Sequence, residues 1–169
     1  MKGKQEFKPQ KTSGGSGISA DHDEITTNLR IQLENVISGK LTLRTRFEYA
    51  GYSFNGIHEN GFLFFQDLVY TPKLKFSLYL RYARFRTDGY NSRIYTFEND
   101  LLYTFSIPEF HGNGHRVYLN LKWSPASNVS VYLKTGCTIH EGVSSWGSGN
   151  DVTSGNKRIE LRGQLYFRF

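Results

Sequence analysis

The chain has a single cysteine, Cys137, and no long run of apolar residues. One cysteine excludes an internal disulfide. No stretch approaches the roughly 20 apolar residues that a membrane-spanning helix needs, and the mean hydropathy is −0.50. Hydropathy does not test for a membrane β-barrel, because each barrel strand turns half of its side chains toward a polar lumen. These absences therefore argue against a disulfide scaffold and a helical membrane protein.

Motifs for catalysis are also lacking. The sequence contains no nucleophile elbow, no phosphate-binding loop and no zinc-ligand set. The spacing of its Ser, His and Asp residues does not indicate a catalytic triad. His111 and His115 stand four residues apart, which suits a metal on a helix, but the glycines between them indicate a surface loop. We therefore expect no enzyme activity, no cofactor and no metal.

Basic residues exceed acidic ones, 21 to 15, which gives a formal net charge of +6. They occur singly at alternating positions, as at Arg44 and Arg46, and not in a block. This pattern is typical of a solvated or lumenal surface and not of a nucleic-acid site. We expect no nucleic-acid partner through this chain.

What the sequence does have is aromatic residues, 15% of the chain, in segments that alternate between apolar and polar. The final segment, 156–169, is the clearest. Its apolar positions are Ile159, Leu161, Gly163, Leu165, Phe167 and Phe169, and its polar positions are Arg158, Glu160, Arg162, Gln164, Tyr166 and Arg168. A period of two predicts a β-strand. Apolar residues toward lipid and charged residues toward a lumen are typical of a transmembrane barrel strand.

The same alternation recurs and predicts an all-β protein. Strands are expected over 29–34, 41–49, 62–70, 74–82, 95–107, 116–123, 129–140 and 156–169. The segment 62–70 is apolar on both parities, so its faces stay unassigned. The predicted fold is an antiparallel up-and-down transmembrane β-barrel, or the C-terminal eight to nine strands of a larger one.

The lengths of the connections bear on the strand count, because bacterial outer-membrane barrels alternate short periplasmic turns with longer outer loops. Short links are predicted at 38–40, 71–73 and 124–128, and long ones at 51–61, 87–93, 108–115 and 141–157. Strict alternation requires 95–107 to fold back at 98–100, which gives nine strands.

An unbroken strand over 94–107 would instead give eight strands and a complete small barrel, but it makes 71–73 an unusually short outer loop. We favour nine strands. Residues 1–23 are then a flexible polar segment, a loop of a longer parent, and 24–169 form the barrel strands. Residues 1–17 also lack the apolar core of a secretory signal, which an outer-membrane protein needs.

The polar faces of the strands predict a charged lumen with a basic excess. The predicted lumen-facing residues are Arg30, Glu34, Arg44, Arg46, Glu48, Lys75, Arg81, Glu98, Asp100, Arg116, Lys122, Lys134, Arg158, Glu160, Arg162 and Arg168. Two interpretations stay open. The charges can form a ladder of ion pairs across strands that holds a lumen without an apolar core. They can also form a basic pore that favours anions.

Aromatic residues near strand ends are candidates for the girdles that flank a membrane barrel. The candidates are Tyr49, Tyr52, Phe54, Tyr70, Tyr82, Phe85, Phe110 and Trp123. The same residues could also cap a soluble barrel.

The segment 51–110 contains GYSFNG, GFLFFQDLVYTP and LRYARFRTDGYNSRIYTFENDLLYTFSIPEF, and the chain ends in YFRF. From about residue 18 onward the chain resembles the C-terminal barrel of a group of Bacteroidota outer-membrane proteins, the helix-hairpin-helix domain-containing proteins. The resemblance implies a longer parent with further strands. The residues that would carry a DNA-related role of that family are not in this chain.

The resemblance also implies a C-terminal signal for the outer-membrane assembly machinery. Leu161, Leu165, Phe167 and Phe169 fit the alternating apolar positions of such a signal, and Gly163 departs from them. The expected partners are the lipid bilayer of a Gram-negative outer membrane, this machinery and other outer-membrane subunits.

The leading hypothesis is thus an integral outer-membrane β-barrel that is porin-like, with a role in transport or membrane assembly. The alternative is a soluble, lipocalin-like barrel whose apolar face points inward around a small ligand. Both use the same alternation, so the sequence alone does not separate them.

Overall fold

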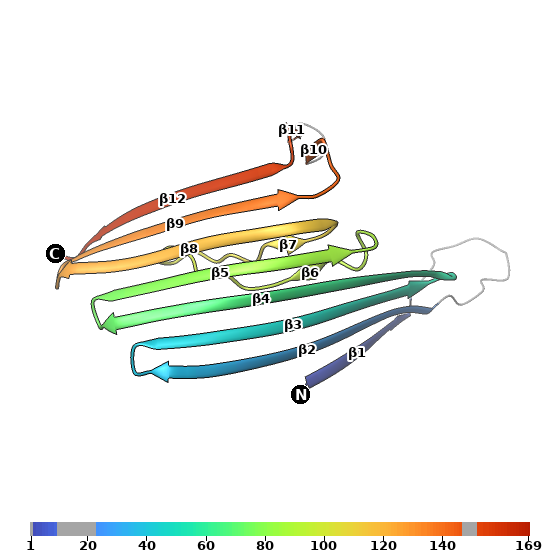
Figure 1. The fold of residues 1–169 in the computed structure, drawn as a ribbon, viewed down its shortest axis with the longest axis horizontal. Coiled ribbons are helices and arrows are strands. Elements are labelled where there is room, and N and C mark those ends of the chain that lie inside the picture. The colour runs from blue at the N-terminus through green and yellow to red at the C-terminus, as the bar shows by residue number, and fades with distance from the viewer. Residues whose placement is uncertain (1, 10–22, 147–151) are drawn as a thin grey trace.

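The computed structural model describes residues 2–9, 23–146 and 152–169, and these residues contain strands and no helix. Eight strands form one antiparallel sheet in chain order, an up-and-down meander (Figure 1). They are β1 (Lys2–Pro9), β2 (Asp23–Ser38), β3 (Leu41–Phe54), β4 (Ile57–Lys73), β5 (Phe76–Thr87), β8 (Asn113–Ala126), β9 (Val129–His140) and β12 (Lys157–Phe167). The predicted all-β, antiparallel, up-and-down class is confirmed.

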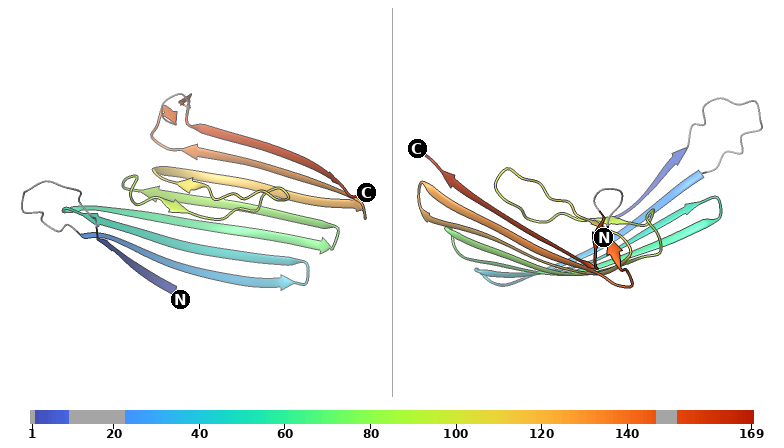
Figure 2. Two further views of the ribbon diagram at one scale, coloured as in Figure 1. Left: turned by 180° about the vertical axis from the view of Figure 1, so that it is seen from behind. Right: turned by 90° about the horizontal axis from the view of Figure 1, so that it is seen from above.

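The sheet bends into a trough (Figure 2). Residues 88–112, between β5 and β8, lie in its concave side; we call them the inserted segment. They contain the two-residue strands β6 (Ile94–Tyr95) and β7 (Glu109–Phe110), which pair with each other. A second short pair, β10 (Ser145–Trp146) and β11 (Thr153–Ser154), forms within the connection that leads from β9 to β12. In the described part of the sheet, β1 and β12 are the edges and do not pair, so no closed barrel is seen.

Side chains alternate between the two faces of the trough, as the sequence pattern predicts. One row of register partners on the concave face runs from Glu34 through Arg44, Asp67 and Arg81 toward Glu160. On the convex face, a neighbouring row joins Leu43, Leu68, Leu80 and Leu119. The concave face is therefore charged, and the convex face is apolar.

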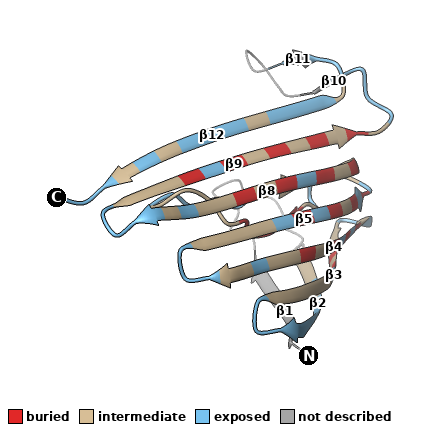
Figure 3. Ribbon diagram, turned by 60° about the vertical axis from the view of Figure 1, so that its left-hand side comes forward, coloured by how far each residue is buried: buried red, intermediate tan, exposed pale blue. Residues whose placement is uncertain are grey.

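The strand β4 shows why 62–70 is apolar on both parities. Phe62 and Phe64 are exposed on the convex face, whereas Leu63 and Phe65 are fully buried on the concave face. Burial in the sheet is concentrated in the parts of β4, β5, β8 and β9 near the inserted segment (Figure 3). Thus, the second apolar parity of β4 packs beneath that segment.

The expected fold-back at 98–100 is wrong, and so is the unbroken strand over 94–107. Only the short β6–β7 pair and an isolated bridge between Glu98 and Ser106 form there. Tyr95 and Phe97 are exposed, whereas Thr96 and Glu98 are buried against the sheet. Polar residues of this run thus find partners on the concave face, so the segment docks on the sheet and adds no strand to it. Strict alternation of short turns and longer connections does not hold either, because β2, β3, β4 and β5 join through three successive short turns.

Two other expectations are corrected. Residues 51–61 are not a loop, because β3 and β4 continue to a two-residue turn. Asn55 (φ 50°) and Gly56 (φ 76°) both have positive φ, as the tightest hairpin turn requires. Residues 2–9 are not a flexible segment but form β1, which pairs with β2 along its length. Backbone hydrogen bonds to an open edge suffice for this strand, whose sequence lacks apolar alternation. The rest of the expected segment, 1 and 10–22, lies outside the described residues.

A clamp closes the base of the inserted segment. The Thr87 amide donates to the Gly112 carbonyl (2.7 Å), and the Gly112 amide donates to the Thr87 hydroxyl (2.9 Å). The segment covers a small core of Ala50, Leu63, Phe65, Ala83, Phe85, Ile94 and Phe110. The expectation that no apolar core exists on the polar face is therefore wrong.

At its start, the segment lies directly on the sheet at Gly61. A Cβ atom at this position would lie 2.1 Å from the Ser92 carbonyl oxygen. The side chain of Glu59 nearby accepts hydrogen bonds from the amides of Asn91 (2.9 Å) and Ser92 (3.1 Å). Glycine at residue 61 is thus required for this close approach.

We predict that Gly61→Ala lifts the start of the inserted segment from the sheet while leaving the strands paired. Limited proteolysis should then cut within 88–112 several times faster than in the parent protein. Gly163→Ala is the matched control, because a Cβ atom there meets nothing within 4 Å. Equal cleavage rates in both variants would contradict the prediction.

Candidate functional site

The inserted segment is fastened to the concave face by buried ion pairs centred on Glu98. This carboxylate is fully buried and accepts two hydrogen bonds from Arg116 (2.6 and 2.7 Å). The ammonium of Lys134, also fully buried, lies 3.2 Å from its second oxygen. Two cations from β8 and β9 therefore satisfy one carboxylate of the segment.

Asp100 extends this network toward β12. Its carboxylate lies 3.4 Å from Lys134 Nζ and 2.8 Å from Arg162 Nη1. Glu160 on β12 pairs with Arg116 and lies 3.5 Å from Arg162 Nη2. The network thus joins the inserted segment to three neighbouring strands.

The glycine at residue 136 makes room for the Glu160 side chain. A Cβ atom there would lie 2.6 Å from the Glu160 carboxylate and 3.2 Å from Arg116 Nη2. Glu160 can therefore lie across β9 to reach Arg116.

A second anchor lies one strand away. Arg81 and Asp67, both buried, form a two-pronged pair (2.5 and 2.8 Å). The remaining Arg81 nitrogen donates to the Phe97 carbonyl oxygen of the inserted segment (2.8 Å). The guanidinium also covers the Phe65 ring, 3.7 Å from its centroid. Arg81 thus ties the segment to both the ion pairs and the apolar core.

Most predicted lumen residues share the concave face, as register and ion pairs show. Arg30 pairs with Glu48 (2.5 Å), and Arg44 pairs with Glu34 (3.0 Å); Arg46 Nη1 lies 3.7 Å from Glu48. The pairs Arg30–Glu48 and Arg44–Glu34 join neighbouring strands, as a ladder of ion pairs requires, and the network around Glu98 adds pairs from outside the strands. Glu98 and Asp100 were placed wrongly on a wall strand, because they reach the ladder from the inserted segment.

Four predicted residues lie apart from this ladder, and one of them is Arg158 on the concave face of β12. Lys75 is in the turn between β4 and β5, and Arg168 follows β12. Lys122 lies on the concave face over the Tyr132 ring, 5.7 Å from its centroid. Neither Lys75 nor Lys122 makes an ion pair within the described residues.

Sequence reasoning missed Asp67 and Tyr118. Asp67 stands in the doubly apolar run of β4, so its face could not be read. Its position as the only charge within 62–70 was the available signal. Tyr118 is buried on β8 between Arg81 and Lys134, whose cationic groups lie 5.4 Å from its ring centroid.

An open pocket of about 420 Å³ lies between the second half of the inserted segment and β8, β9 and β12. The segment contributes residues 105–111, and the sheet contributes Arg116, Thr138, His140, Arg158, Glu160 and Arg162. The pocket therefore joins a partly apolar wall to a charged one.

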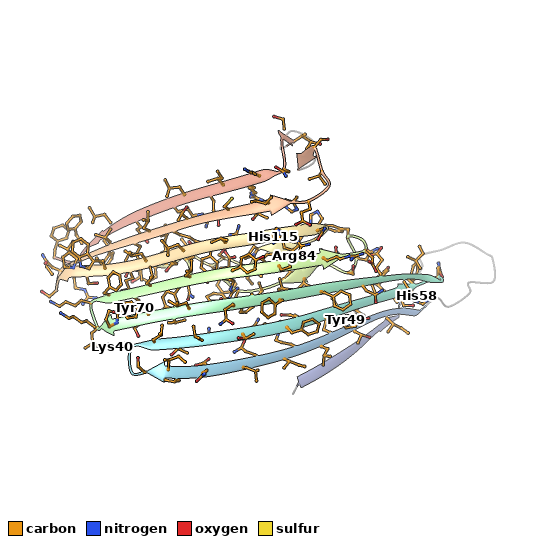
Figure 4. All side chains as sticks on the ribbon, in the orientation of Figure 1. Lys40, Tyr49, His58, Tyr70, Arg84 and His115 are labelled. Carbon is orange, nitrogen blue, oxygen red and sulfur yellow. The ribbon has the colours of Figure 1, made fainter. Side chains whose placement is uncertain are left out.

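A polar network lies on the convex face near the end that carries the longer connections. Glu141 accepts two hydrogen bonds from Arg84 (2.6 and 2.9 Å) and one from Asn113 (2.8 Å). The Nε2 atom of His115 lies 2.5 Å from Glu141 Oε1. Figure 4 shows Arg84 and His115 side by side. These bonds, above all those from Arg84, lower the pKa of Glu141 to about 2. His115 thus lies in β8, not in the expected loop, whereas His111 lies in the segment, 2.7 Å from Glu109.

Six of the eight proposed girdle residues separate into two groups, and the other two, Tyr52 and Phe54, stand at the end of β3. Tyr49, Tyr70, Tyr82 and Trp123 lie on the convex face toward its ends (Figure 4 labels Tyr49 and Tyr70). Phe85 and Phe110 are instead buried in the core beneath the inserted segment, with ring centroids 5.2 Å apart. These two are not girdle residues, because the segment covers the face on which Phe85 lies.

The residues of the predicted assembly signal lie at the open edge of the sheet. Leu161, Leu165 and Phe167 point outward from β12 on the convex face, and Phe169 follows the strand. Leu161 is 73% exposed. Their role as a signal stays a prediction.

Comparison with protein-family models, curated proteins and solved structures found no match to this chain. Among the described residues, no helix has the length and apolar character to cross a membrane. No group of His, Cys, Asp and Glu side chains in those ranges is arranged to hold a metal ion.

We predict that Glu98→Gln detaches the inserted segment. The substitution leaves Arg116 and Lys134 buried without their shared charge partner, which typically costs about 3 to 5 kcal/mol. The expected result is faster proteolysis within 88–112 and a lower melting temperature. Glu34→Gln, in an exposed pair with Arg44, is the control and should change the unfolding free energy by about 1 kcal/mol or less. An unchanged cleavage pattern in Glu98→Gln would refute the anchoring role.

Proposed function

We propose that this chain forms part of the wall of an outer-membrane β-barrel, with a charged lumen that the inserted segment narrows, and that it acts as a channel or transporter. The observation that carries the proposal is the distribution of side chains on the curved sheet. Apolar residues cover the convex face, and ion pairs cover the concave face. This distribution supports a barrel in lipid over a soluble sheet packed on a core.

The exposed apolar residues support a lipid-facing band. On the convex face, exposed large apolar residues include Ile31, Leu33, Phe47, Phe62, Phe64, Leu80, Val117, Trp123, Ile159, Leu161 and Leu165. Large contiguous apolar patches are rare on soluble monomers and mark contact with protein or membrane. The charged group of Arg84, Glu141 and His115 lies on the same face, in the row that also holds Phe47 and Phe64. The apolar band is therefore interrupted at this group.

The inserted segment bears on the size of the barrel. An eight-stranded barrel has an interior just wide enough for its own side chains. Here the concave side also holds residues 88–112 with a core of their own. We therefore infer that the closed barrel contains more strands than the eight of this sheet, and that β1 and β12 pair with them. This agrees with the resemblance to the C-terminal barrel of larger Bacteroidota proteins.

A soluble, lipocalin-like barrel is the weaker alternative. It requires the apolar face to be concave and to surround the ligand. In the sheet, the apolar parity is convex, and the concave face instead carries ion pairs and a small core. A role in membrane assembly, with partners at the open edges, stays compatible with the proposed barrel.

We predict that Leu161→Arg prevents stable insertion into detergent micelles or lipid vesicles. Arg facing lipid costs about 2 to 4 kcal/mol near the bilayer midplane. Gln164→Arg, on the concave face of the same strand, is the matched control and should insert normally. Partitioning between buffer and micelles, followed by circular dichroism and heating, measures the difference. A parent chain that is monomeric and folded in buffer, or a Leu161→Arg variant that inserts like the parent, would overturn the proposal.

Transport is tested separately by conductance in planar bilayers, with the chain assembled with the further strands that close the barrel. Replacing residues 95–107 with a short Gly-Ser link removes the part of the segment that lies over Arg81 and Arg116. Because this opens the lumen, we predict a severalfold higher single-channel conductance. Shortening the β9–β12 connection within 143–145 is the control and should leave conductance unchanged. Equal conductance in all forms would count against a lumen narrowed by this segment.

A further inference from the structure

The pocket between the inserted segment and β12 has two unlike walls. On the segment side, Phe105 is 75% exposed and Ile107 is 46% exposed, so apolar surface faces the opening. On the sheet side stand three arginines, Arg116, Arg158 and Arg162. A ligand that fits both walls has an apolar body and a charged group.

Two of the three arginines are already occupied. Arg116 donates to Glu98, to Glu160 and, through Nη1, to the Thr138 hydroxyl (2.8 Å). Arg162 pairs with Asp100 and Glu160. Arg158, which is exposed, makes no hydrogen bond or ion pair with any residue in the described ranges. The free guanidinium of the pocket is therefore that of Arg158.

The two carboxylates that line the pocket already have partners other than Arg158. Glu160 is held by Arg116 and Arg162. Glu109 lies 2.7 Å from His111 and accepts the Tyr95 hydroxyl (3.1 Å). Both acids thus have partners of their own, and the Arg158 charge is left for a ligand.

We propose that this pocket binds a small organic carboxylate, with the carboxylate on Arg158 and the apolar body against Phe105 and Ile107. A guanidinium matches a carboxylate through two parallel hydrogen bonds, and the volume of about 420 Å³ admits a ring-sized molecule. The site deepens the proposed function by naming a solute class, and it rests on that function only for the route by which the solute arrives.

The test is isothermal titration of the full chain, folded in micelles, with benzoate, benzyl alcohol and acetate. Benzoate should bind, and benzyl alcohol, which lacks the charge, should bind at least about tenfold more weakly. Arg158→Gln should weaken benzoate binding by a similar factor. Phe105→Ala should weaken the binding of benzoate but not that of acetate.

Lys122→Gln is the matched control, because it removes one charge from the same face outside the pocket. Circular dichroism and the proteolysis pattern of 88–112 show whether each variant keeps the fold. No benzoate binding by the folded parent chain, or equal weakening by Arg158→Gln and Lys122→Gln, would overturn the site. Benzoate binding by a chain that fails to enter membranes would instead overturn the proposed function and leave the site standing.

Discussion

The buried Glu98 carboxylate is the interaction on which the arrangement of the concave face depends. A lone buried charge costs several kcal/mol, and a charge with well-placed partners does not. Glu98 brings Arg116 and Lys134 together from β8 and β9, and Asp100 and Glu160 then connect the same cations to β12. The inserted segment can therefore pack on a charged surface, because its own carboxylates pair with the cations there. An apolar loop would leave those cations without partners.

Apolar residues are packed differently on the two faces of the sheet, because the two faces have different surroundings. On the concave face, packing is local: Phe65 and Phe85 are buried only where Ile94 and Phe110 cover them. On the convex face, nothing in the described structure covers the rows of Leu, Phe and Val. Two kinds of apolar residue thus occur on one strand, as in β4, and only the concave kind is covered by other residues of the described ranges.

Much of the fold could be read from the sequence, because alternation of period two fixes strands and faces without knowledge of neighbours. The faces of β2, β3, β5, β8, β9 and β12 were predictable in this way. The run 95–107 was misread because it also alternates, and only the partners of Glu98 on distant strands show that its polar side is the buried one. The face of Asp67 could not be predicted, because β4 is apolar on both faces and one of these faces packs in a core that forms only when the inserted segment docks.

The clamp between Thr87 and Gly112 has a consequence for how the sheet forms. The other neighbouring strands from β2 to β9 join through tight hairpins, whereas β5 and β8 are separated by residues 88–112. Closing that longer loop costs more chain entropy than closing a hairpin. Pairing of β5 with β8 should therefore be a late step that joins two preformed hairpin units. Docking of the segment requires the same closure, so its contacts stabilise the pairing of β5 with β8.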